Sequence, residues 1–187
     1  MKPKANFGYY IDALLQKRWS PRAFADRMIM ENQALTLFEA ARWAASCNNA
    51  QPWLFIWSLK DGSEKYAKLL DCLMPGNREW AGSAPLLILT LVQSNFSDGK
   101  PNRWAGHDLG LAVGNLSTQA TSMDLYVHSM AGFSAEKAKE HFALPEGVEP
   151  MTMIAVGHLG EPSMLSEFNQ KREEAPRERK PLTEMFL

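Results

Sequence analysis

The chain has 187 residues, a length that suits one domain and is short for two. Hydrophobic residues make up 45% and charged residues 22%, which excludes collagen-like, low-complexity and wholly disordered proteins. Twenty Lys and Arg residues nearly balance 21 Asp and Glu residues, so the chain as a whole is not a basic nucleic-acid-binding protein. Any anion site must therefore be a local cluster of cations.

The first half of the chain predicts three helices, one strand and a turn. In chain order the ranges are helix 7–17, helix 31–46, strand 53–59, helix 63–73 and turn 74–77. The first helix should end at Arg18, because the residue before Pro21 is pushed out of the helical region. The buried face of the second helix is predicted to carry Leu35, Phe38, Ala41 or Arg42, and Ala45.

The second half predicts three strands and two helices. In chain order the ranges are strand 84–92, helix 103–124, strand 126–133 running into a glycine loop, helix 135–143 and strand 151–160. Asn102 is the expected N-cap of the long helix and Ser134 that of the next one. The long helix carries the most regular apolar stripe of the chain, at Ala105, Leu109, Ala112, Leu116, Ala120 and Met123. The last 25 residues are charged and proline-containing, so we expect an arm there.

The pattern of cysteines and apolar runs predicts a cytoplasmic protein. The first 20 residues lack the apolar core of a signal peptide, and no stretch approaches the roughly 18 apolar residues of a membrane-spanning helix. Cys47 and Cys72 lie 25 positions apart and form no CxxC pattern, which favours reduced thiols. The four histidines show no metal-ligand spacing, so no metal site is expected.

Arg18, Ser20 and Arg22 alternate directly after the first predicted helix. In an extended segment alternate side chains point the same way, so all three could face one ligand. Two guanidiniums and a hydroxyl suit a phosphate or an anionic ring edge. The alternative is a solvated basic turn, with Arg22 paired to Asp26 four residues on.

Two further patterns carry information. The segment ASCNNAQPW (45–53) places amide and hydroxyl groups between a helix end and a buried strand, where they can recognise a heterocycle edge or satisfy the loop backbone. Gly106, Gly110 and Gly114 recur every four residues in the long helix, at a cost of about 1 kcal/mol each relative to Ala. This cost indicates close approach of another helix or a second subunit.

Together these motifs resemble the FMN-dependent nitroreductase family over nearly the whole chain. RWSPRAF (18–24), ASCNNAQPW (45–53), the long helix with its strand and glycine loop (102–133) and ERKPLTE (178–184) are similar to four motifs of that family, in the same order. The resemblance implies one nitroreductase-like domain over 1–187, with an α+β fold around a mainly antiparallel central sheet flanked by helices. It also implies a homodimer in which residues 163–187 wrap the partner subunit.

The resemblance assigns cofactor contacts residue by residue. Arg18 and Ser20 match phosphate and ribityl contacts, with Arg177 and Arg179 also near the phosphate, and Arg22 matches a basic residue beside flavin N1 and O2. The contacts expected from the partner subunit are Ser46, Asn49 and Gln51, and Asn48 remains an alternative to Asn49. The loop Met130, Ala131, Gly132 matches the one whose backbone N–H donates to flavin N5. Trp19 and Cys47 complete the expected cofactor-binding set.

The activity implied by the resemblance is an NAD(P)H-dependent FMN oxidoreductase. NADH or NADPH would reduce the flavin and leave, and a nitroaromatic or quinone-type acceptor would then take the electrons at the same face. Ala131 stands where enteric-type members have an acidic residue, so nicotinamide preference and acceptor range are not carried over. The alternatives are a non-catalytic FMN carrier or sensor, a relative performing reductive dehalogenation, and a flavin-free interaction protein.

Overall fold

The computed structural model of the chain describes residues 5 and 7–187. Within these residues four antiparallel strands form one sheet in the order β1-β2-β4-β3. The strands are β1 (Trp53–Leu59), β2 (Leu86–Gln93), β3 (Tyr126–Met130) and β4 (Val148–Gly157). The expected α+β fold with an antiparallel central sheet is confirmed.

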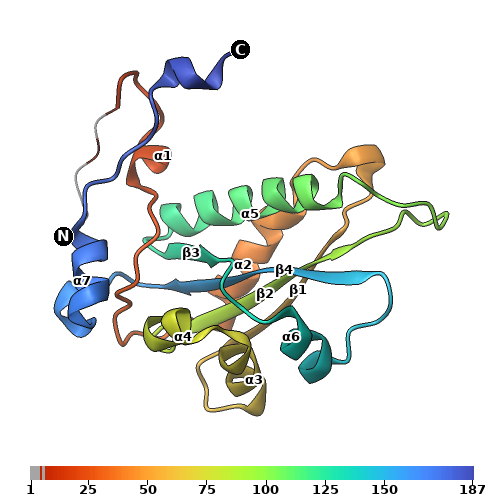
Figure 1. Ribbon diagram of the computed structural model, residues 1–187, viewed down its shortest axis with the longest axis horizontal. Helices are drawn as coiled ribbons and strands as arrows, with labels where there is room; N and C mark the ends of the chain where they lie inside the picture. Colours follow the sequence, from red (N-terminus) through yellow and green to blue (C-terminus); the bar gives the residue numbers. More distant parts are fainter. Residues whose placement is uncertain (1–4, 6) are drawn as a thin grey trace.

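Helices cover both faces of this sheet. The α-helices of the described residues are α1 (Ala13–Lys17), α2 (Glu31–Arg42), α3 (Glu64–Cys72), α4 (Pro75–Ala81), α5 (Ala105–Ser122), α6 (Ala135–Phe142) and α7 (Glu167–Glu174). Figure 1 shows α5 on one side of the sheet and α3, α4 and α6 on the other. Helix α2 shares the hydrophobic core of α5, so the molecule has three layers.

Strand β2 is buried on both faces, because side chains alternate along a strand. Leu86 and Ile88 pack into the core formed with α2 and α5. Leu87 and Leu89 pack into the core formed with α3, α4 and α6. The continuous apolar run of this segment therefore reflects a strand covered by helices on both sides.

The apolar stripe predicted for the long helix is confirmed in α5. Its members from Ala105 to Ala120 are buried, and Met123 packs against the same core. Gly106, Gly110 and Gly114 lie on the exposed side of the helix. A Cβ added at Gly110 or Gly114 would meet no atom of the described residues within 4 Å. Packing within this chain therefore does not require glycine at these two positions.

Two of the expected helices are shorter in the structure. The first begins at Ala13 rather than residue 7, because the Asp12 carboxylate caps it by accepting the Leu14 N–H at 2.8 Å. Helix α2 ends at Arg42 rather than 46, before the turn that leads into the asparagine loop. Of its expected buried face, Ala41 is buried and Phe38 packs against the core, but Leu35 is 51% exposed. The buried positions are Ala34, Leu37 and Ala41.

Other boundaries were also wrong. The expected turn at 74–77 is the start of α4, because Pro75 occupies the first helical position, where its missing N–H costs nothing. The N-cap of α5 is Trp104 rather than Asn102, whose side-chain oxygen instead accepts the Trp104 N–H at 3.1 Å. Strand β4 lies three residues earlier than expected, and the described residues hold seven α-helices where five were expected.

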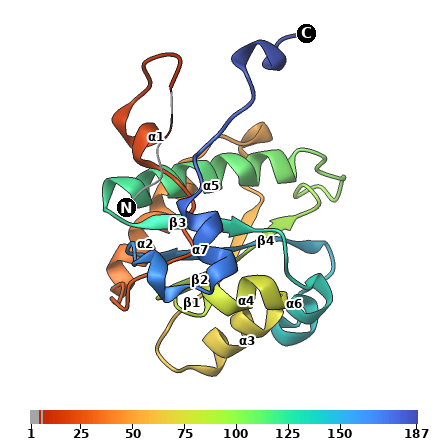
Figure 2. The same ribbon diagram turned by 60° about the vertical axis from the view of Figure 1, so that its left-hand side comes forward.

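The last 25 residues divide into two parts. Helix α7 packs on its own chain, because Asn169 is buried and its side-chain amide donates to Glu79 of α4 at 3.2 Å. Beyond Pro176 the chain leaves the layered body, as Figures 1 and 2 show. The exposed apolar side chains of this end are Leu182, Met185, Phe186 and Leu187. Only this second part has the character of an arm.

Two further findings concern the cysteines and the helices of the described residues. Cys47 and Cys72 are both free thiols, and the cytoplasmic location inferred from them remains a prediction. None of the helices in residues 5 and 7–187 combines the length and the apolarity needed to cross a lipid bilayer.

Candidate functional site

A cavity of about 210 Å³ lies between the segment that follows α1 and the C-terminal segment. Residues from both ends of the sequence form its walls. The expected site residues that line it are Arg18, Trp19, Ser20, Arg22, Arg177 and Arg179. The structure thus brings together the two predicted cationic motifs, which are separated by more than 150 residues.

The backbone around Arg18 explains how its side chain is presented. Arg18 ends α1 in an extended conformation, with φ −58° and ψ 130°. Its guanidinium Nη1 donates to Ser20 Oγ at 3.4 Å, so both side chains lie on the same side, as the alternation predicts. Arg177 donates to the backbone carbonyls of Gln16 and Arg18 at 3.1 and 2.8 Å. The C-terminal segment is thereby tied to the end of α1.

Three guanidiniums of this cavity have no carboxylate partner among the described residues. Arg18, Arg177 and Arg179 form no ion pair with any carboxylate of the residues that the structure describes. Burial lowers the pKa of Arg18, and the charge of Arg179 lowers it further. Burial likewise lowers the pKa of Arg177, with added repulsion from Arg18 and Arg179. An anion bound among these cations would relieve their repulsion.

Trp19 lies in the same wall and is only 6% exposed. Its ring meets Tyr126 edge-on at a centroid distance of 6.3 Å. The indole N–H is buried and has no hydrogen-bond partner among the described residues. An unpaired buried donor is unfavourable, so this N–H lacks an acceptor that the described residues do not supply.

Arg22 does not form the surface ion pair with Asp26 that the sequence offered as an alternative. Its guanidinium lies 6.0 Å from the centroid of the Trp80 ring, and no ion pair with Asp26 is formed. Burial lowers the pKa of Arg22, and the nearby charge of Arg172 lowers it further. Glu173 has the opposite effect on the Arg22 guanidinium and also accepts the Arg22 backbone N–H at 2.8 Å.

The second predicted motif forms a strained loop before β1. Asn48, Asn49 and Gln51 all have positive φ, between 48° and 55°, a region that asparagine tolerates better than most residues. The Ser46 hydroxyl accepts the Gln51 N–H at 3.0 Å, so this side chain satisfies the loop backbone. The buried carboxylate of Asp108 in α5 accepts the Cys47 N–H at 3.0 Å and anchors the loop.

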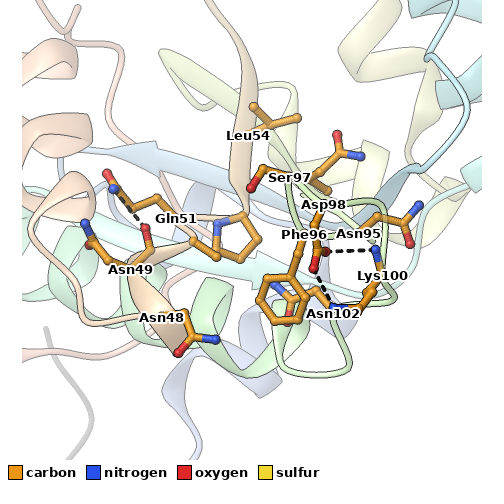
Figure 3. A pocket seen from close by; sticks show the side chains of 13 residues that line it. Asn48, Asn49, Gln51, Leu54, Asn95, Phe96, Ser97, Asp98, Lys100 and Asn102 are labelled. Atoms are coloured by element: carbon orange, nitrogen blue, oxygen red, sulfur yellow. Dashed lines mark hydrogen bonds and ion pairs between the residues drawn. The ribbon is translucent and has the colours of Figure 1, made fainter.

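A groove of about 840 Å³ opens beside this loop. In Figure 3 the 48–51 loop faces the 95–102 segment across it. Its polar lining is mainly carboxamides, from Asn48, Asn49, Gln51, Gln93, Asn95 and Asn102. The two charged lining residues, Asp98 and Lys100, pair with each other at 2.9 Å. The groove is therefore close to neutral and suits a polar, uncharged ring.

Helix α5 separates the two predicted halves of the site. Lys17, next to Arg18, pairs with Asp124 just beyond the C-terminal end of α5. The 45–51 loop is anchored at Asp108, in the first turn of the same helix. Sixteen residues of helix correspond to about 24 Å. Figure 1 likewise shows the two segments at opposite ends of α5. Within one chain the structure does not bring these halves together.

The third predicted element, the loop from Met130 to Gly132, packs against the start of α4. The Gly132 carbonyl accepts the Met74 N–H at 3.1 Å and the Asn77 side-chain amide at 3.0 Å. A Cβ at Gly132 would lie 2.6 Å from the Asn77 amide nitrogen, so this contact requires glycine. The loop does not line either of the two cavities described at the other two motifs.

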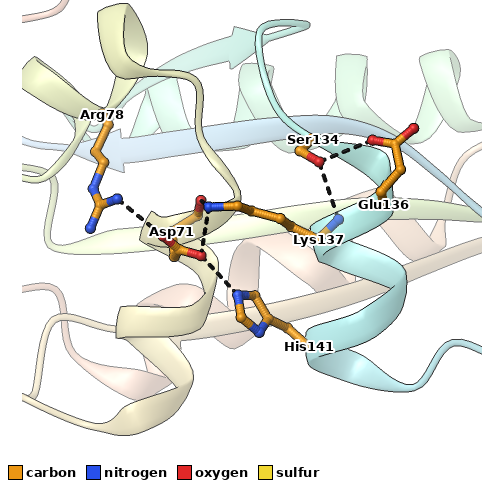
Figure 4. A network of polar contacts seen from close by, with 6 residues as sticks. All are labelled: Asp71, Arg78, Ser134, Glu136, Lys137 and His141. Atoms are coloured by element: carbon orange, nitrogen blue, oxygen red, sulfur yellow. Dashed lines mark hydrogen bonds and ion pairs between the residues drawn. The ribbon is translucent and has the colours of Figure 1, made fainter.

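A network of ionic contacts fixes the helix that follows this loop. The Asp71 carboxylate accepts from Lys137 at 3.0 Å, from His141 at 2.9 Å and from Arg78 at 3.1 Å (Figure 4). Hydrogen bonds from His141 and Lys137 lower the pKa of Asp71 to about 2. The network joins α3 to α4 and α6, the two helices that flank the Met130–Gly132 loop.

Sequence patterns missed the residues that hold these motifs in place. They are Asn77, Asp108, His128 and Glu173, which act on backbone groups of distant segments. For Asp108 one signal existed, since it lies three residues from Ala105, beside the apolar stripe of α5. Within the described residues no group of three or more His, Cys, Asp or Glu side chains is placed to hold a metal ion.

Fold and site together define an α+β protein with a cationic cavity built from both chain ends and a neutral amide groove at the far end of its longest helix. A sequence model described as the nitroreductase family matches residues 15–158. The chain belongs to the nitroreductase family.

Similar proteins agree with this assignment. A solved structure described as an oxidoreductase containing FMN is 32% identical, with a TM-score of 0.92 over 97% of this chain and 93% of that one. A putative nitroreductase from Desulfovibrio desulfuricans, solved in complex with FMN, shares the fold at 22% identity, with a TM-score of 0.74 over 95% and 97% of the two chains. An uncharacterized 15.4 kDa protein of Mycolicibacterium smegmatis is 36% identical over 62% of this chain and 77% of its own length.

Proposed function

We propose that this chain binds FMN and works as an oxidoreductase that passes electrons from NADH or NADPH to nitroaromatic or quinone-type acceptors. Family membership and the FMN-containing relative at 32% identity support the proposal. The observation that carries it is the cavity in which Arg18 and Arg179 converge from the two ends of the chain without a carboxylate partner.

The residues of this cavity fit the phosphate end of FMN. Arg18 and Arg179 would bind the phosphate oxygens by charge-assisted hydrogen bonds, and Arg177 would support them through its contact with the Arg18 carbonyl. The Ser20 hydroxyl and the unpaired Trp19 indole N–H offer further donors to an oxygen-rich chain. When bound, the flavin would supply the hydride and electron chemistry, which the protein orients and tunes.

We further propose that the active form is a homodimer. The amide groove and the arginine cavity lie at opposite ends of α5, so two copies in opposite orientation would let each contribute one half to a shared site. The exposed face of Gly110 and Gly114 offers close backbone approach to a second copy. The apolar end of the chain, from Leu182 onward, has no cover within the described residues and suits the same partner.

Within the site, the residues of this chain have separate tasks. The Asn49 and Gln51 carboxamides, on a strained loop anchored by Asp108, would recognise the ring edge in the partner's cavity. The backbone of the loop from Met130 to Gly132 would offer the N–H donor to flavin N5. The half-buried Arg22 guanidinium would favour negative charge on the ring, as a cation in a partly desolvated site does.

The test is reconstitution followed by an acceptor screen. The purified protein, incubated with FMN and desalted, should retain a flavin absorption spectrum and should oxidise NADH or NADPH when a quinone or nitroaromatic is added. Retained flavin with negligible turnover would favour a carrier or sensor on the same fold. A protein that remains colourless after reconstitution would exclude the FMN proposal.

A further inference from the structure

Glu173 is a buried carboxylate in the wall of a cavity that is otherwise cationic. It lies at the end of α7 and is only 2% exposed. Its Oε2 accepts the backbone N–H of Arg22 at 2.8 Å, and its Oε1 accepts that of Ala23 at 3.2 Å. Both carboxylate oxygens are therefore used by two consecutive peptide groups, 150 residues away in the sequence.

The negative charge of Glu173 at this position disfavours the binding of an anion in the cavity. Burial raises the pKa of Glu173, and the two backbone N–H donors and the Arg22 guanidinium oppose that effect. A negative charge in the wall would repel a phosphate in the same cavity. A carboxylate at this place should therefore have another role that offsets the repulsion. The two hydrogen bonds that Glu173 accepts from the backbone indicate that role. The adjacent Glu174 is exposed and makes no such contact with the Arg22 segment.

The same short segment is held from two other directions. His128 of β3 donates its Nδ1–H to the Pro21 carbonyl at 2.8 Å, since a carbonyl can only accept. On the other side of Arg22 and Ala23, the Ala25 N–H donates to the His158 carbonyl at 2.9 Å. Between these two points Glu173 supplies the acceptors for the Arg22 and Ala23 N–H groups, while the Ala23 carbonyl accepts the Gly160 N–H at 2.9 Å beside the isolated bridge of Phe24 to Leu159.

We propose that Glu173 is a positioning residue: it fixes the Arg22–Ala23 backbone so that the guanidiniums of Arg18 and Arg22 face the anion, and thereby makes anion affinity depend on α7. The inference rests on the proposed function, in which this cavity receives the phosphate of FMN. Helix α7 is itself anchored by Asn169, which donates to Glu79 of α4. The C-terminal helix thus acts on the site through the backbone of another segment rather than by touching the ligand.

The direction in which FMN affinity changes in Glu173→Gln shows whether Glu173 acts by positioning the backbone or only through its charge. Glu173→Gln removes a negative charge from the cavity wall, so a residue acting only through its charge would give tighter FMN binding in the variant. If Glu173 positions the backbone, FMN binding should instead weaken. The glutamine side chain has one acceptor oxygen, whereas the Arg22 and Ala23 N–H groups use two. We expect FMN affinity to fall about tenfold relative to wild type, and riboflavin affinity to fall less. Glu174→Gln, the matched control, should leave both affinities unchanged.

Amide hydrogen exchange tests the contacts themselves without flavin. In the wild-type protein the Arg22 and Ala23 amides should exchange slowly, although neither belongs to a strand or helix. In Glu173→Gln both should exchange faster, with unchanged rates in the cores of β2 and β4. Unprotected amides in the wild type overturn the proposal even if the variant fails to fold, as does FMN binding that is equal or tighter in a folded Glu173→Gln protein. If the wild-type protein has protected amides but binds no FMN, the proposed function is refuted. The contacts of Glu173 with the Arg22 and Ala23 backbone would then have a structural role only.

Discussion

The guanidinium of Arg177 donates to the backbone carbonyl of Arg18 at 2.8 Å. This contact joins two residues that are 159 positions apart and sets the end of the chain against the end of α1. Its other terminal nitrogen donates to the Gln16 carbonyl, so Arg177 is occupied by backbone groups. Arg18 and Arg179 are consequently better placed than Arg177 to contact a bound anion directly.

Replacing Arg18 with alanine should weaken FMN binding and spare riboflavin binding. Hydrogen bonds to a charged group contribute about 1.5–3 kcal/mol, so we expect a loss of roughly 10- to 150-fold in FMN affinity. Riboflavin lacks the phosphate and should bind both proteins alike. Fluorescence titration measures both constants, with the exposed Arg27→Ala as control. An equal loss for the two flavins would contradict the phosphate assignment.

Arg22→Gln should lower the midpoint potential of bound FMN. A buried cation near the ring stabilises its reduced, more negative form over the oxidised form, and Arg22 is half-buried beside Trp80. For a two-electron couple about 30 mV corresponds to 1.4 kcal/mol, so a shift of several tens of millivolts is expected. Redox titration of the loaded protein measures it. An unchanged potential would leave Arg22 with a purely structural role.

Alanine at Gly110 distinguishes a monomer from a dimer by the sign of its effect. In an isolated chain the new Cβ meets no described atom within 4 Å, and the gain in helix propensity should stabilise the protein by about 1 kcal/mol. Where a second copy packs on this face, the added methyl should weaken the dimer instead. Denaturant unfolding and light scattering measure the two effects. Stabilisation without any change in oligomeric state would argue against this interface.

Removing residues 180–187 should weaken the dimer while the fold is kept. This segment lies outside the layered body and exposes Leu182, Met185 and Phe186, whereas α7 and its Glu173 contact remain in the shortened chain. Sizing and light scattering at micromolar concentration should show more monomer than in the full chain. A shortened protein that stays fully dimeric would show that the exposed end is not part of the interface.

His128 should make stability depend on pH. Burial, together with repulsion from the neighbouring guanidiniums, lowers its pKa to about 4. In the unfolded chain the pKa is about 6.5, so as pH falls the unfolded state takes up the proton first and stability declines from about pH 6.5 down to 4. Between pH 7 and pH 5 the loss should be about 2 kcal/mol. Denaturant unfolding at both values, compared with His128→Gln, measures it; the same loss in the variant would contradict this assignment.

Local sequence patterns determined most of the helices and strands. Strand β1 at 53–59 and the buried stripe of α5 follow from side-chain spacing, which is set by the geometry of each element alone. Ser134 caps α6 as expected, because a cap needs only the next three residues. The resemblance to the nitroreductase family was likewise visible in the sequence, and the family match over residues 15–158 confirms the family, whereas the fourth motif at 178–184 lies beyond that match.

Tertiary structure decided what those patterns could not express. Helix α4 replaced an expected turn because Trp80 and Ala81 are buried in the core against the sheet, which outweighs the turn preference of the MPGN sequence. The roles of Asp108 and Glu173 depend on backbone N–H groups 61 and 150 residues away. No periodicity or motif encodes such pairs, since the spacing of a carboxylate along its own element does not say which distant backbone N–H it will meet. They exist only because the folded chain brings these segments together and excludes water from them.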